Sequence, residues 1–424
     1  MRIENIDFGP LDQTIAGLES ILQDLRSKPE LKSDELFIQL VVNETRRIRY
    51  AKEEGKALVG TTVLMPSEIL YAMDIVPMPI EYLAFLITEV TRTYEESLSA
   101  AKAFGFAPEI CSVHRIVSGQ CIRGTIPKPD AVIWSNQVCD NTVKGADCML
   151  ELYGCPGFFL DRPYRYTEVD VRYLTGALED MVRFLEDVTR RKLDHDRLKE
   201  VVKVSTRELA IVREIRDLRR AIPAPLKSRT FCHYAVVEAL FQGSPEALGW
   251  IEQVRDEVKA NVEQKRGVVP QERYRLIHLF IPPFNMWELI DWLESDRGAV
   301  SVAEPYCFTW GPGDPDPERP LESLARKCFY KPIARQMHGP IEEGVLADTF
   351  TDAREFKAEG AIFWAHIGCR EACACIKMLK DGLMEKLGIP MLVLDNDIAD
   401  PTYVTIDQIK DKLEGFLEIL DDRK

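Results

Sequence analysis

Apolar and polar residues follow one another along the chain in two distinct patterns. Residues 11–25 and 34–56 carry apolar side chains at the spacing of an amphipathic helix. From residue 57 onward, short apolar runs rich in β-branched residues alternate with longer stretches of helical periodicity. The predicted strands are 57–64, 76–80, 131–135, 157–160, 276–281, 299–303, 361–364 and 391–394.

This order of elements predicts the fold class. Helices are predicted between the strands, with 82–104 as one long helix and 405–420 as the last. Alternating strands and helices build parallel sheets covered by helices, so we expect an α/β protein with doubly wound parallel sheets. The expected parts are an N-terminal helical segment (1–56), a first α/β domain (57–165), a central helical connector (166–270) and a second α/β domain (271–424).

Composition narrows the class of protein without defining its chemistry. The 424 residues are too many for one ordinary core, and 46% of them are hydrophobic, as in globular proteins. A net charge of −15 and the lack of a basic stripe argue against a nucleic-acid partner. The start of the chain lacks the pattern of a secretory signal, and prolines and acids interrupt the most apolar stretch, 57–87. We therefore expect a cytoplasmic protein without a membrane span.

The eleven cysteines are the unusual part of the composition. Their spacing does not match a small secreted disulfide framework. Cys111, Cys139 and Cys369 each lie beside a predicted strand end or helix start, where a helix N-terminus favours the thiolate form. Thiolates are the ligands of iron–sulfur clusters. Ligands about 30 and 230 residues apart match no local metal motif, so residue types alone leave a metal site and buried packing cysteines equally open.

Several nucleotide and hydrolase motifs are absent from the sequence. No Walker A pattern occurs, and no Gly-x-Gly-x-x-Gly opens a helix after a strand. A Gly-x-Ser-x-Gly elbow and a His-Glu-x-x-His zinc helix are also missing. Any nucleotide chemistry must therefore come from a partner.

Seven short motifs follow one another between residues 57 and 420. They are Pro66–Leu70, Val76–Pro77, Cys111–Arg115, Pro127–Cys139, Asp161–Tyr164, His366–Arg370 and Gly388–Gln408. In this order they resemble the 2-hydroxyacyl-CoA dehydratase and benzoyl-CoA reductase family.

The resemblance implies two Rossmann-like domains and a [4Fe-4S] cubane held by Cys111, Cys139 and Cys369. It also implies a separate ATP-hydrolysing iron–sulfur activator that delivers one electron at low potential, which agrees with the missing Walker A motif. The implied activity is anaerobic reductive activation of an acyl-CoA, either 2-hydroxyacyl-CoA dehydration by a lyase or a related reduction by an ATP-dependent reductase. A homodimer or a homologous second subunit is the expected assembly.

Two residues of the matched motifs are candidate catalytic groups. Glu68 is predicted to handle a proton or hydroxyl group of the substrate, or simply to complement a helix dipole. His366 is predicted to hydrogen-bond a cluster sulfide or move a proton, or to steady its loop as a buried histidine.

A second set of cysteines departs from the family pattern. Cys121 and Cys148 trail Cys111 and Cys139, and Cys373 follows Cys369 by one helical turn. Six thiolates suffice for two cubanes, which resembles the double-cubane [8Fe-9S] branch, whose homodimeric members reduce small molecules with an ATP-driven activator. The alternative is that these cysteines only pack. A non-catalytic scaffold subunit is a further alternative, although the three intact cysteines argue against it.

Overall fold

The computed structural model describes residues 2–424 and divides them into two compact units. Unit 1 comprises residues 2–210, 237–253 and 312–330, and unit 2 comprises the remainder. The predicted connector, 166–270, is therefore shared, because 211–236 and 254–270 belong to unit 2 and its other residues to unit 1.

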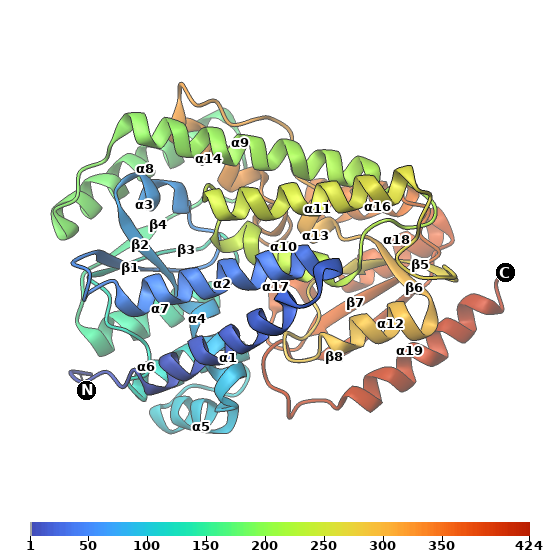
Figure 1. Cartoon of the computed structure of the whole chain (residues 1–424), viewed down its shortest axis with the longest axis horizontal. Coiled ribbons are helices and arrows are strands. Elements are labelled where there is room, and N and C mark those ends of the chain that lie inside the picture. The colour runs from blue at the N-terminus through green and yellow to red at the C-terminus, as the bar shows by residue number, and fades with distance from the viewer. Residues whose placement is uncertain (1) are drawn as a thin grey trace. The chain divides into compact units, whose positions relative to one another are not determined.

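Unit 1 is built on a four-stranded parallel sheet in the order β2-β1-β3-β4 (Figure 1). Every residue of the two central strands, β1 and β3, is buried. Their apolar runs are therefore continuous rather than alternating, as expected for strands covered on both faces. The strands are β1 (Ala57–Thr61), β2 (Ile75–Pro79), β3 (Ala131–Ser135) and β4 (Gly157–Leu160).

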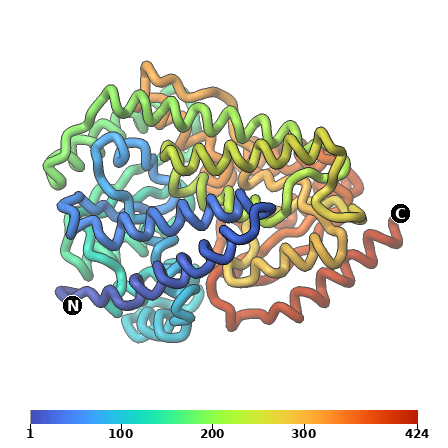
Figure 2. The backbone as a smooth tube through the Cα atoms, viewed as in Figure 1, coloured from blue at the N-terminus to red at the C-terminus, as the bar shows by residue number. Residues whose placement is uncertain are grey.

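The N-terminal helices α1 (Gly9–Arg26) and α2 (Lys32–Tyr50) pack against each other, and the dark-blue trace in Figure 2 follows them side by side. Helices α8 (Glu168–Thr189) and α14 (Pro320–Tyr330) cover a hydrophobic core that includes strands β1 and β3. The other helices of this unit are α3 (Ser67–Ala72), α4 (Ile80–Thr91), α5 (Tyr94–Phe104), α6 (Ser112–Ile122), α7 (Asp140–Tyr153) and parts of α9 (His195–Leu218), α10 (Arg229–Leu240) and α11 (Pro245–Glu263).

The prediction of a single helix over 82–104 was wrong. Helix α4 ends at Thr91, and Arg92 adopts a left-handed conformation with φ 56°. Helix α5 then folds back onto α6, and an added Cβ at Gly119 would lie 1.9 Å from the carbonyl oxygen of Ser97. The break has no local Gly or Pro to signal it, so only the close packing of α5 on α6 fixes it.

Unit 2 repeats the arrangement with the strand order β6-β5-β7-β8. Its strands are β5 (Tyr274–Leu279), β6 (Ala299–Ala303), β7 (Gly360–His366) and β8 (Met391–Asn396). Its helices include α12 (Glu288–Arg297), α13 (Pro305–Phe308), α15 (Pro332–Met337), α16 (Ala347–Glu355), α17 (Arg370–Cys373), α18 (Ile376–Leu387) and α19 (Ile406–Asp421).

In both sheets the first strand along the chain lies in the interior. The order in which later strands are added reverses beside it, although all strands stay parallel. In unit 1 this switch point lies between the carboxyl ends of β1 and β3, and in unit 2 between those of β5 and β7. Leu64 and Phe280, which follow β1 and β5, have left-handed φ angles of 68° and 67°. Bulky residues rarely adopt this conformation, and such strain concentrates at functional edges.

The expected α/β class with two parallel sheets and N-terminal helices is confirmed. Over residues 2–424, every helix is too short or too polar to span a lipid bilayer.

Candidate functional site

Three helices of unit 1 begin at the carboxyl edge of its sheet. Helix α4 directly follows β2, and α7 follows β3 after a short loop. Helix α6 packs on both, and the side-chain amide of Gln120 near its end donates to the Thr88 hydroxyl near the end of α4 at 2.7 Å. Because α4 and α6 are in register near their ends, their N-termini lie at the same edge, with that of α7 beside them. Three positive dipole ends therefore meet there.

Two of the predicted cluster cysteines occupy the first positions of these helices. Cys111 is the N-cap of α6 and Cys139 the N-cap of α7. Their exposed fractions are only 9% and 8%, so both thiols are shielded but not sealed. Free backbone N–H groups at a helix start stabilise a thiolate, which is the form that binds iron.

His114 connects the two helices at this point. Its Nε2 lies 3.9 Å from Sγ of Cys139, and the Thr142 hydroxyl lies 3.4 Å from the same sulfur. An added Cβ at Gly145 of α7 would lie 3.0 Å from Nδ1 of His114, so glycine leaves the room that this ring fills. The sequence did not single out Thr142 or Gly145, because their roles depend on which helix faces which.

Polar contacts hold the loops that carry the cysteines. The Arg115 side chain donates to the Ile110 carbonyl at 2.9 Å, inside the first cysteine loop. Asn136 joins the loops after β3 and β4: its amide donates to Asp161 Oδ1 at 3.0 Å and accepts from the Arg162 backbone N–H at 2.8 Å. These bonds explain why an amide stands immediately after strand β3.

Arg162 is a buried cation that the sequence did not reveal. It is 1% exposed, donates to the Cys328 carbonyl at 3.0 Å and stacks on the Phe329 ring at 4.8 Å. Burial lowers the pKa of this guanidinium to about 10, because removal from water disfavours its charge. Its place in an Asp-Arg-Pro motif was the only signal in the sequence.

Glu68 lies at the start of α3 and is fully buried. Its carboxylate accepts a 2.6 Å hydrogen bond from the Ser205 hydroxyl and forms an ion pair with the ammonium of Lys327, which is 5% exposed. Three helices of unit 1 therefore meet at this carboxylate. A lysine in direct contact compensates the buried charge, and removing it would leave an isolated ion.

In unit 2 the third cysteine loop follows β7. His366 is the last residue of that strand and is 1% exposed, and its Nδ1 accepts a hydrogen bond from the Ile398 N–H at 3.1 Å. A neutral ring with an accepting Nδ1 carries its proton on Nε2. Cys369 is 8% exposed and is the N-cap of α17, and the Cys373 thiol donates to the His366 carbonyl at 3.4 Å. Cys373 therefore lies close to the predicted ligand loop.

The other trailing cysteines are placed differently. Cys121 and Cys148 stand ten and nine residues beyond Cys111 and Cys139, about 15 and 14 Å along their helices. Cys121 lies against the Tyr153 hydroxyl, and burial raises the pKa of its thiol. Cys121 lies in the last turn of α6 and Cys148 past the middle of α7, so both lie away from the edge where Cys111 and Cys139 stand.

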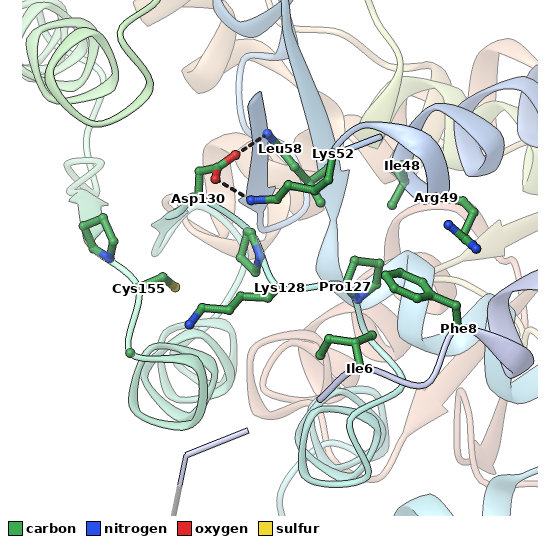
Figure 3. A pocket seen from close by; sticks show the side chains of 13 residues that line it. Ile6, Phe8, Ile48, Arg49, Lys52, Leu58, Pro127, Lys128, Asp130 and Cys155 are labelled. Carbon is green, nitrogen blue, oxygen red and sulfur yellow. Dashed lines mark hydrogen bonds and ion pairs between the residues drawn. The ribbon is translucent and has the colours of Figure 1, made fainter. Parts of the chain in front are cut away.

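A pocket of about 370 Å³ opens at the opposite, amino-terminal edge of the same sheet (Figure 3). Asp130 bridges the Lys52 ammonium and the Leu58 backbone N–H, and Lys128 and Cys155 line the wall. Helix α7 ends here, so the basic side chains complement a negative helix end. They thus have a structural explanation, and the candidate site remains at the carboxyl edge.

The donor set of unit 1 fits an iron–sulfur group in chemistry, since it offers two shielded thiols at helix N-termini with polar neighbours. Throughout residues 2–424, no three His, Cys, Asp or Glu side chains gather into a group that could hold a metal ion. Unit 1 thus supplies two of the three predicted ligands, and Cys369 belongs to unit 2.

Comparisons with known proteins agree with the motifs. A model of the family described as "2-hydroxyglutaryl-CoA dehydratase, D-component" matches residues 62–420. One of the subunits of benzoyl-CoA reductase from Thauera aromatica is 22% identical over 94% of this chain and 98% of the relative. The alpha subunit of (R)-2-hydroxyisocaproyl-CoA dehydratase of Clostridioides difficile is 21% identical over 92% and 98%, respectively. That of (R)-phenyllactyl-CoA dehydratase of Clostridium sporogenes is 21% identical over 87% and 91%.

Proposed function

Because the chain belongs to the 2-hydroxyglutaryl-CoA dehydratase D-component family, we propose that it is an iron–sulfur enzyme subunit that reductively activates an acyl-CoA thioester. The reaction class that we propose is dehydration of a 2-hydroxyacyl-CoA, with a related acyl-CoA reduction as the neighbouring possibility within the family. The relatives include subunits of a dehydratase and of a reductase, which supports both of these reaction classes.

The observation that carries the proposal is the pair of cysteines at the carboxyl edge of the first sheet. Cys111 and Cys139 begin two packed helices, and His114 contacts the sulfur of Cys139. Ligands bind at this edge in open α/β sheets, beside the switch point. A helix pair that delivers two thiols there is what a cluster site needs.

We assign Cys111, Cys139 and Cys369 as the protein ligands of a [4Fe-4S] cluster. When bound, such a cluster supplies one-electron reduction and a Lewis-acidic iron for the thioester carbonyl. The protein's own residues would shield the cluster from water, because each of the three proposed ligand cysteines is less than 10% exposed.

We propose roles for Glu68 and His366 on the same basis. The neutral ring of His366 places a donor at Nε2, since its Nδ1 accepts from a backbone N–H. Glu68 stays a predicted site residue, and its ion pair with Lys327 holds its carboxyl group at the start of α3.

The expected partners are an ATP-hydrolysing iron–sulfur activator and a second subunit, either homologous or a second copy of this chain. The lack of a Walker A motif supports a separate source of ATP-driven electrons. The relatives are themselves named as single subunits of larger enzymes, which supports a multisubunit assembly.

Iron and acid-labile sulfide should be measured in protein purified without oxygen. We expect about four irons per chain, because three thiolates and one open position accommodate one cubane. Cys111→Ser, Cys139→Ser and Cys369→Ser should each lose most of this iron. (R)-2-hydroxyglutaryl-CoA, (R)-2-hydroxyisocaproyl-CoA and benzoyl-CoA are the substrates to test with the activator added.

Cys121→Ser and Cys148→Ser are the matched controls, because they change thiols farther along the same helices. Unchanged iron in both supports the single cubane. About eight irons, lowered by both of these variants and by Cys373→Ser, would instead establish the double-cubane [8Fe-9S] protein that reduces small molecules. Absence of iron from the wild-type protein would leave only a scaffold subunit.

A further inference from the structure

Glu81 stands in the first turn of α4, at the same edge of the sheet as Cys111 and Cys139. It is 6% exposed, and helix α4 packs along α6, whose N-cap is Cys111. The backbone N–H of Val63, in the loop that leaves β1 at the switch point, is one of the two donors nearest to its carboxyl group.

The carboxyl group of Glu81 has no side-chain partner that would stabilise a negative charge. Neither of its oxygens has a hydrogen bond of ordinary geometry, and no side chain of residues 2–424 bonds or pairs with it. The backbone N–H groups of Glu81 itself and of Val63 are the only groups that favour its charged form. Burial outweighs them and raises the pKa of Glu81 to about 8, so the group holds its proton near neutral pH.

The second unit shows how this fold treats a comparable glutamate. Glu304 directly follows β6, the strand that corresponds to β2, and it is 1% exposed. Arg219 pairs with both of its oxygens, at 2.8 and 2.6 Å, and Ser301 donates a further bond. Unit 2 thus compensates its buried carboxylate, whereas unit 1 leaves the Glu81 carboxyl uncompensated.

A buried acid without a partner destabilises a protein, and functional sites are where such unfavourable groups persist. Packing alone would be served better by an apolar side chain at this position. Glu81 lies at the same edge of the sheet as two candidate ligand cysteines, and this position gives the group a chemical use.

We propose that Glu81 is the proton donor to the hydroxyl group that leaves the substrate at this edge, an inference that rests on the proposed dehydration of a 2-hydroxyacyl-CoA. The carbon–oxygen bond at C2 breaks with its electron pair on oxygen. The Glu81 carboxyl transfers its proton to that oxygen, and water departs. Loss of a proton from C3 and return of the electron then complete the dehydration, so the substrate loses one water in total, and the Glu81 carboxylate takes up one proton in place of the one it gave. The electron that weakens the carbon–oxygen bond comes from the activator named in the proposed function.

The first test reads the protonation of Glu81 without any turnover. The infrared difference spectrum between the full-length wild-type protein and Glu81→Gln at pH 7 should contain the carbonyl stretch of a protonated carboxylic acid. A difference spectrum with carboxylate bands alone would overturn the proposal, because an ionised Glu81 has no proton to give.

A second test separates function from packing. Glu81→Met should leave the thermal unfolding midpoint equal to or above that of wild type. Methionine has a similar volume to glutamate, and the substitution removes a buried acid that has no compensating charge. The matched variant Glu304→Met should lower the midpoint, because it strands the buried charge of Arg219. A drop for Glu81→Met as large as that for Glu304→Met would assign Glu81 a structural role and overturn the proposal.

The third test is catalytic and uses the complete system with activator. Glu81→Gln should lower kcat by about 100-fold or more with little change in KM, while iron per chain stays at the wild-type value. An unchanged kcat would overturn the role of Glu81 alone. Wild-type protein that lacks iron and turnover would overturn the proposed function instead, so the two failures are distinguishable.

Discussion

At the scale of single residues, the candidate site depends on contacts around sulfur. The polar neighbours of Cys139 Sγ include the His114 ring and the Thr142 hydroxyl. When the His114 ring carries its proton on Nε2, it donates toward this sulfur, and a donor to a ligand sulfur raises the reduction potential of the group that the sulfur binds. His114 is therefore a positioning residue whose influence should be measurable as a potential.

We expect His114→Phe to lower the reduction potential of the proposed cluster in the purified protein, as followed by electron paramagnetic resonance in a redox titration. About 1 kcal/mol of differential hydrogen bonding corresponds to roughly 40 mV for one electron. His114→Gln keeps a donor on a shorter side chain and should restore part of the difference. Equal potentials for all three proteins would show that the His114 ring only fills space.

At the scale of elements, the positions of the cysteines depend on how closely the helices approach. Gly119 lets α6 meet the α5 backbone, and Gly145 lets α7 meet the His114 ring. The break at Arg92 between α4 and α5 exists because α5 must turn back to make this contact. A shift of α6 would move Cys111 at its start together with Gly119 near its end.

Gly119→Ala should lower the free energy of unfolding by roughly 1–3 kcal/mol or more, because its Cβ would overlap the Ser97 carbonyl. Urea unfolding followed by circular dichroism measures this change. Iron retention should fall as well, since α6 carries a proposed ligand.

Gly176→Ala in α8 provides the matched control. No atom lies within 4 Å of the added Cβ, so this substitution should be neutral or slightly stabilising. If Gly119→Ala were as stable as Gly176→Ala, helices α5 and α6 could move apart without a loss of folding free energy. That result would contradict the prediction.

At the scale of the whole molecule, two units share one strand order and place a cysteine after the third strand. Cys139 follows β3 and Cys369 follows β7, each beside its own switch point. Unit 2 buries two neutral histidines, His233 and His278, and burial lowers their pKa values to about 3 and about 4.

These histidines make the stability of the chain depend on pH in a defined direction. The unfolded state binds a proton at His278 near pH 6.5, whereas the folded state resists it down to about pH 4. Stability from this group is therefore complete above pH 6.5 and is lost as the pH falls toward 4. Between pH 7 and pH 5 the loss should be about 2 kcal/mol for this single residue.

Urea unfolding at pH 7 and pH 5 tests this dependence. His278→Gln keeps an acceptor for the Trp364 indole N–H, which donates to the ring at 3.2 Å, and it should reduce the difference between the two pH values. His195, which is exposed, offers a control in His195→Gln that should leave the difference unchanged. A His278→Gln variant as acid-sensitive as wild type would contradict the prediction.

Local patterns along the chain were enough to specify the α/β class, the positions of the eight strands to within a few residues and the order of the cysteine loops. Apolar runs specify strands locally, and motifs specify a family, because both are properties of neighbouring residues. The same patterns placed Cys111 and Cys139 beside a strand end or a helix start, and both are N-caps of helices in the structure.

Which residues act on one another became visible only in the folded chain. Gly145, Thr142 and Glu81 carried no signal, because their meaning depends on helices that meet across many residues. The fold also pairs Glu68 with Lys327, which lies 259 residues away. It further places Cys121 and Cys148 away from the edge where Cys111 and Cys139 begin their helices. Burial, charge compensation and helix contact are properties of the tertiary structure, and no local pattern encodes them.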